Sequence, residues 1–275
     1  MPKKADWAKK LRIGCSGWGY KDWLGPFYPK DLAQSDFLKF YSRVFDAVEI
    51  DSSFYRIPNA SMISNWTASV PANFVFTAKL PKRMTHDKHL VGIENEIAYF
   101  QKMMKSFGKK LGAVVVQLPP SFKIEKDLEG LKDFLHLIDK EIRYAIEFRH
   151  KSWFKEDVYK LLHDHNVSMA WAITQYLETA AELTSDLLYL RLVGDREITQ
   201  FTGIQKDQSD EMKKWIKKIE EQKDSFSDGF VFFNNHFAGF GPASVNEFRR
   251  LAGLMEMEWL SVQGLSSKQA SLTEF

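Results

Sequence analysis

The chain has 275 residues, 44% of them hydrophobic and 27% charged, an ordinary globular composition with enough apolar material for a large core. A formal net charge of +2 excludes a strong overall field that would attract nucleic acid or an anionic membrane. The single cysteine, Cys15, excludes an internal disulfide. Because no apolar run is long enough for a signal peptide or a membrane span, we expect a cytoplasmic protein without membrane contact.

Short strands and amphipathic helices alternate along the chain. Runs rich in apolar, β-branched and aromatic residues predict strands at 11–17, 46–54, 73–81, 111–119, 143–150, 167–173, 187–194 and 229–235. Apolar residues at helical spacing predict helices at 34–45, 93–108, 126–140, 155–165, 209–222 and 243–255. We expect one domain at 11–262, preceded by an extension at 1–10 and followed by a polar tail at 263–275.

This alternation predicts the fold. Roughly eight strands and their helices over about 250 residues are typical of a single TIM-type (β/α)8 barrel, an α/β fold. The alternative is an open, doubly wound sheet. It lacks support because no predicted strand is followed by the glycine-rich loop of dinucleotide-binding sheets.

One stretch raises the question of function. VEIDSSFYRIP, residues 48–58, places two carboxylates between the apolar side chains of a predicted core strand. Strand side chains alternate between faces, so Glu49 and Asp51 are predicted inside the barrel, while Val48 and Ile50 face the helices. The same alternation predicts further polar interior side chains near the strand ends, where barrel active sites form: Thr77, Lys79, Gln117, Glu147, Arg149, Tyr189, Arg191 and Asn234 or Asn235.

The predicted interior layer contains three acids and three bases. Buried charges need partners, because unpaired burial costs several kcal/mol for each charge. A ligand site is the favoured interpretation, since five or six strands repeat the pattern. The alternative is an ion-pair network that only fills the barrel.

Seven motifs in order resemble the YecE-like proteins, also called domain of unknown function family 72: GCSGWGYKDWLGPFYP, VEIDSSFYRIP, FVFTAKLPKRMTHDKHL, LGAVVVQLPPSF, AIEFRHKSWF, YLRLVG and VFFNN. The resemblance extends from about Arg12 to Leu254. It implies a TIM-type barrel and no established activity. Members often have a histidine where this chain has Val193. The matching positions are Trp18, Tyr20, Trp23, Glu49, Tyr55, Lys79, His86, Gln117, Glu147, Arg149, Arg191 and Asn234.

Three kinds of chemistry fit these residues. Glu49 and Glu147 suit the acid and base of a hydrolase, including a glycosidase. Lys79, Arg149 and Arg191 suit a phosphate or carboxylate, because guanidinium groups bind such anions in a bidentate manner. A divalent metal is a third option, since four histidines follow predicted strands: His86, His89, His150 and His236.

The combined prediction is a hydrolase acting on a phosphorylated or other small anionic substrate. Glu49 and Glu147 carry the acid–base work, and His86 assists them. The predicted substrate-binding residues are Tyr20, Trp23, Asp51, Tyr55, Lys79, Gln117, Arg149, Arg191 and Asn234. The alternative is a noncatalytic binder of an anionic metabolite or of nucleic acid.

Overall fold

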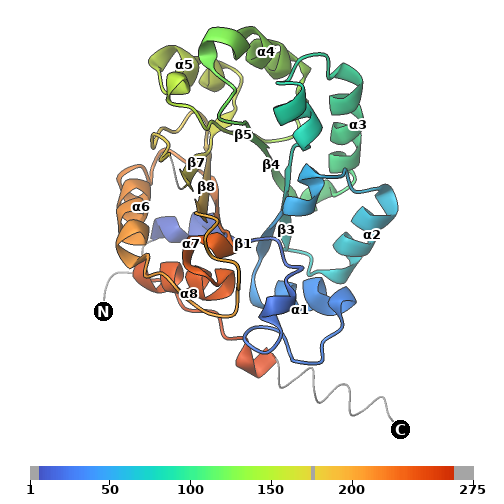
Figure 1. Cartoon of the computed structure of the whole chain (residues 1–275), viewed down its shortest axis with the longest axis vertical. Helices are drawn as coiled ribbons and strands as arrows, with labels where there is room; N and C mark the ends of the chain where they lie inside the picture. Colours follow the sequence, from blue (N-terminus) through green and yellow to red (C-terminus); the bar gives the residue numbers. More distant parts are fainter. Residues whose placement is uncertain (1–5, 175–176, 263–275) are drawn as a thin grey trace.

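Nine strands form the centre of the computed structural model, which describes residues 6–174 and 177–262 (Figure 1). Each predicted strand segment overlaps at least one of them. The strands are β1 (Leu11–Ser16), β2 (Ala47–Ile50), β3 (Val75–Lys79), β4 (Leu111–Gln117), β5 (Tyr144–Glu147), β6 (Ser168–Met169), β7 (Trp171–Thr174), β8 (Leu187–Gly194) and β9 (Asp228–Phe233).

The sheet closes into a barrel. Its strands are parallel and follow the order β6-β5-β4-β3-β2-β1-β9-β8-β7. The two edge strands, β6 and β7, are separated in the chain by Ala170 alone, whose amide donates to the carbonyl of Ile146 at 2.9 Å. The segment 167–173, predicted as one strand, therefore forms two short strands, β6 and β7, on either side of Ala170. The TIM-type barrel is confirmed, and the open doubly wound sheet is wrong.

Helices surround the barrel (Figure 1). Six correspond to the predicted amphipathic segments: α1 (Phe37–Val44), α3 (Glu94–Lys105), α4 (Ile124–Leu137), α5 (Glu156–Asp164), α6 (Ser209–Glu221) and α8 (Gly241–Leu251). The sequence pattern missed α2 (Ala60–Ser69), because Ile63 is its one fully buried residue, and it missed the single turn α7 (Asn235–Ala238). Every helix in the described ranges is too short or too polar to cross a membrane.

Part of the predicted N-terminal extension forms a 3-10 helix, η1 (Asp6–Lys10), which buries Trp7 and Ala8. The predicted polar tail at 263–275 lies outside the described residues.

Side chains inside the barrel form layers that follow the alternation of the strands. An apolar layer lies toward the strand starts and includes Ala47, Val75 and Ala145. Two residues further along the same strands come Glu49, Thr77 and Glu147, all fully buried. Another two residues bring Asp51, Lys79 and Arg149 to the C-terminal ends of the strands. The barrel therefore changes from apolar to charged along its axis, and the charges gather at its mouth.

Candidate functional site

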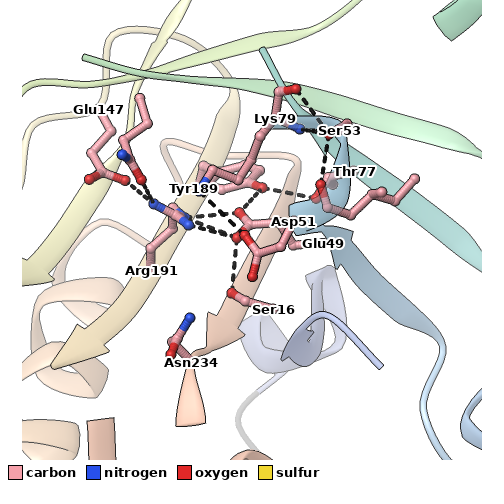
Figure 2. A network of polar contacts seen from close by, with 12 residues as sticks. Ser16, Glu49, Asp51, Ser53, Thr77, Lys79, Glu147, Tyr189, Arg191 and Asn234 are labelled. Atoms are coloured by element: carbon pink, nitrogen blue, oxygen red, sulfur yellow. Dashed lines mark hydrogen bonds and ion pairs between the residues drawn. The ribbon is translucent and has the colours of Figure 1, made fainter. Parts of the chain in front are cut away.

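Arg191 lies at the centre of the buried polar layer. Only 2% of its surface is exposed. Its Nε and Nη2 donate to the carboxylate of Glu49 at 2.9 and 2.7 Å. Its Nη1 donates to Gln117 Oε1 at 3.1 Å and to the carboxylate of Glu147. Figure 2 shows the guanidinium between the two glutamates, so side chains from β2, β4, β5 and β8 meet here.

Glu49 has protein partners on both carboxylate oxygens. Besides Arg191, it accepts hydrogen bonds from Ser16 Oγ at 2.9 Å and from the Tyr189 hydroxyl at 2.8 Å. The Tyr189 hydroxyl also lies 2.9 Å from Thr77 Oγ1. Burial acts to raise the pKa of Glu49, but Arg191, Lys79 and Tyr189 together outweigh burial and hold the pKa below its usual value. Glu49 is therefore ionised and enclosed at neutral pH.

Glu147 is held in the same way. It accepts from Arg191 through one oxygen and from Arg149 Nε at 2.7 Å through the other. Burial opposes its ionisation, yet Arg191 and Arg149 lower its pKa to about 2. Glu49 and Glu147 were the predicted acid and base, but neither has any exposed surface. Both carboxylates are enclosed by their hydrogen-bond partners in this structure, and their roles as acid and base stay a prediction.

Above this layer lies a second set of residues, the mouth group: Asp51, Phe54, Lys79, His86 and Arg149. Lys79 Nζ lies 3.3 Å from Asp51 Oδ1 and 4.5 Å from the centre of the Phe54 ring. The Asp51 side chain keeps 28% of its surface exposed. Enclosure by the surrounding protein and the nearby charge of Glu49 raise the pKa of Asp51, even though Lys79 opposes this.

Arg149 offers the mouth group's free hydrogen-bond donors. It lies two residues after the end of β5, and 21% of its side chain is exposed. Its Nε donates to Glu147, while its two Nη atoms have no hydrogen-bond partner among the described residues. The ion pair fixes the position of the guanidinium and leaves its outer edge available.

His86 lies close to these cations. It belongs to a π-helical turn, η5 (Arg83–Asp87), and its ring centre is 5.1 Å from that of Phe54. Its Nδ1 lies 2.9 Å from Thr85 Oγ1. Burial, followed by the charges of Arg149 and Lys79, lowers the pKa of His86 to about 4. The imidazole is therefore neutral at pH 7.

The other predicted binding residues lie in different surroundings. Trp23 is fully buried among aromatic side chains, where its Nε1 donates to Asn235 Oδ1 at 3.2 Å, so it has no ring face free for a ligand. Tyr20 is half-buried and donates to a backbone carbonyl at 2.9 Å. Asn234 caps α7, apart from the network in Figure 2. Tyr55 is 81% exposed and free to contact a ligand.

The histidines predicted as metal ligands are dispersed. His89 Nδ1 lies 3.0 Å from Asp127, His150 caps a 3-10 helix (Lys151–Trp153), and His236 Nδ1 donates to the carbonyl of Ile198. Within residues 6–174 and 177–262, no three His, Cys, Asp or Glu side chains group closely enough to hold a metal.

Two participating residues were absent from the sequence prediction. Ser16 alternates with Ile13 and Cys15 on its strand, so the rule that found Glu49 would also have found Ser16. Phe54 lies in η4 (Asp51–Phe54) after β2, where strand alternation gives no signal.

Cavities of about 240 and 440 Å³ lie elsewhere, and no residue of the buried polar layer lines either one.

Comparison with known proteins adds the family context. A family model described as "Protein of unknown function DUF72" matches residues 12–269. UPF0759 protein YunF of Bacillus subtilis is 26% identical over 290 residues, spanning 95% of this chain and 99% of YunF. UPF0759 protein YecE of Escherichia coli K12 is 26% identical over 144 residues, spanning 52% of this chain and 50% of YecE. A crystal structure of a DUF72 family protein from Thermotoga maritima has a TM-score of 0.77 at 25% identity, covering 88% of this chain and 99% of that chain.

Proposed function

Since the chain belongs to the DUF72 family of proteins of unknown function, we propose its function from the site itself: the barrel mouth binds the phosphate or carboxylate group of a small molecule. The observation that carries this proposal is Arg149. Its Nε is held by Glu147, while the Nη edge is partly exposed and unpaired among the described residues. A guanidinium fixed in this way is arranged for bidentate binding of an anion.

The buried layer supports this use of Arg149. Arg191 holds Glu147, and Glu147 in turn holds Arg149, so the partly exposed cation is oriented by a fully buried carboxylate. Because these groups are already ordered, little further conformational entropy is lost in them when a ligand binds. The role of Glu147 is therefore positioning.

Lys79 and His86 complete the anion site. Lys79 is paired with Asp51. The raised pKa of Asp51 favours protonation of this carboxylate, and protonated Asp51 would leave the Lys79 ammonium group available to an anionic ligand. The neutral imidazole of His86 supplies a further hydrogen-bonding group beside Arg149. Binding of the anion should accordingly be linked to uptake of a proton by Asp51 or His86.

Hydrolysis of the bound compound is the reaction that we propose, with Asp51 as the proton-transferring residue. A general acid or base needs contact with its substrate and a pKa moved toward the working pH. Asp51 meets both conditions better than Glu49 or Glu147, which are enclosed and have lowered pKa values. The second candidate is a noncatalytic binder of the same anion, which the enclosed glutamates favour.

Arg149→Gln tests the binding proposal. Binding of inorganic phosphate, phosphorylated sugars and small carboxylates is measured by calorimetry. Charge-assisted hydrogen bonds contribute about 1.5–3 kcal/mol, so affinity should fall about tenfold to a hundredfold in the variant. Arg143→Gln is the matched control, because Arg143 precedes the same strand at the opposite end of the barrel and pairs with Asp186 and Asp228. Equal affinity in wild type and Arg149→Gln would refute the proposal.

Asp51→Asn separates the two candidates. For a hydrolase, the variant should retain binding of the compound that wild type cleaves and should lose turnover. For a binder, wild type should leave every bound compound intact over long incubation.

A further inference from the structure

A pair of histidines lies on the outer helices, away from the barrel mouth. His136 is in the last turn of α4, and His165 is the residue that ends α5. These helices are neighbours in the outer ring (Figure 1). The two imidazole ring centres are 5.4 Å apart, with the ring planes at 72°. Residues far apart in sequence thus bring two metal-ligating groups together.

Hydrogen bonds fix the tautomer of both rings. His136 Nδ1 lies 2.7 Å from the carbonyl oxygen of Lys132, and His165 Nδ1 lies 2.9 Å from that of Leu161. A carbonyl oxygen only accepts, so each Nδ1 carries the hydrogen and each neutral ring keeps its lone pair on Nε2. Histidines that bind metals have this same arrangement, because the Nδ1 hydrogen bond orients the ring.

The spacing of the rings fits a shared ion. With metal–nitrogen bonds of about 2.0–2.1 Å, the ion lies about 3.2 Å from each ring centre, and two ligands at a tetrahedral angle have ring centres about 5.2 Å apart. The observed separation is 5.4 Å. We propose that His136 and His165 bind a divalent transition metal, Zn²⁺ or Cu²⁺, through their Nε2 atoms and so link α4 to α5.

The surroundings favour a cation at this place. Both residues lie at helix C-termini, where the peptide dipoles leave partial negative charge. Two neighbouring lysines are already paired, Lys132 with Glu129 at 2.8 Å and Lys160 with Asp164 at 2.7 Å. Two protein ligands leave the remaining coordination positions to water, so the ion should exchange readily. Imidazole ligands select zinc, copper and nickel over magnesium and calcium.

The test uses untagged, full-length protein freed of metal with a chelator. Zinc chloride is titrated into it calorimetrically, and the melting temperature is recorded with and without zinc. We expect one zinc ion for each chain and a higher melting temperature. Both effects should disappear in His136→Gln and in His165→Gln. His163→Gln is the control, because His163 lies in the same segment, and its side chain is 75% exposed and approaches Asp164.

A spectroscopic measurement on the wild type tests the proposal even if a variant fails to fold. Electron paramagnetic resonance of bound Cu²⁺ should show two imidazole nitrogens. Absence of saturable zinc binding, or binding that survives both substitutions, would overturn the proposal, since the ion would then lie elsewhere. A copper spectrum with fewer than two imidazole nitrogens would overturn it as well.

Discussion

Arg191→Met should cost far more stability than the loss of a comparable surface arginine. The guanidinium is 2% exposed and binds both Glu49 and Glu147. Methionine fills a similar volume but removes the cation that the two enclosed carboxylates share, which leaves Glu49 with hydroxyl partners and Glu147 with Arg149 alone. Breaking a buried ion pair in this way costs about 3–5 kcal/mol.

The magnitude can be worked from Glu147. Arg191 and Arg149 overcome burial and lower its pKa from 4.5 to about 2. Each pKa unit corresponds to about 1.4 kcal/mol, so the ionised carboxylate contributes about 3 kcal/mol to folding at neutral pH. Because the folded pKa lies below the unfolded one, this contribution is complete above pH 4.5 and is lost as the pH falls toward 2. The lowered pKa of Glu49 acts in the same direction.

Urea unfolding followed by circular dichroism measures this effect. Arg143→Met is the control, because Arg143 also binds two acids, Asp186 and Asp228, but is 34% exposed. Its loss should cost about 1 kcal/mol or less, since surface pairs contribute little. The difference in the free energy of unfolding between Arg191→Met and wild type should become smaller in acid, where the carboxylates take up protons. Equal losses for the two variants at neutral pH would refute the account of the buried layer.

Three further measurements examine single residues. His86 should titrate near pH 4 in nitrogen-15 NMR spectra. Its pKa should rise with added phosphate, because a bound anion offsets the positive charges of Arg149 and Lys79. An unchanged pKa would show that the phosphate does not bind beside His86. Trp23→Ala should lower the free energy of unfolding by about 3–5 kcal/mol in urea, because the ring is fully buried, and a loss below about 1 kcal/mol would contradict its core position. Cys15 should resist iodoacetamide in the folded protein, because burial raises the pKa of its thiol; rapid labelling of folded protein would show it to be accessible.

Strand alternation made the barrel and its interior charges predictable. Whether a side chain faces inward depends on its neighbours one position away, as with Glu49 between Val48 and Ile50. Such a local rule needs no tertiary information, so it found the layer that contains Glu147 and Arg191. The corresponding rule for helices, apolar residues at helical spacing, failed for α2, because that helix buries Ile63 alone and has no strong apolar stripe.

Only the tertiary structure decided which charges meet and which remain accessible. Glu49 and Arg191 are 142 residues apart and lie on strands that are not neighbours in the sheet, so their pairing depends on how the barrel closes. Closure also encloses Glu147 while leaving part of Arg149, two residues later, exposed at the mouth. The sequence by itself thus determined which side chains enter the barrel, because alternation is local. Their partners and exposure depend on the packing of the whole barrel, because burial and ion pairing are properties of distant segments brought together.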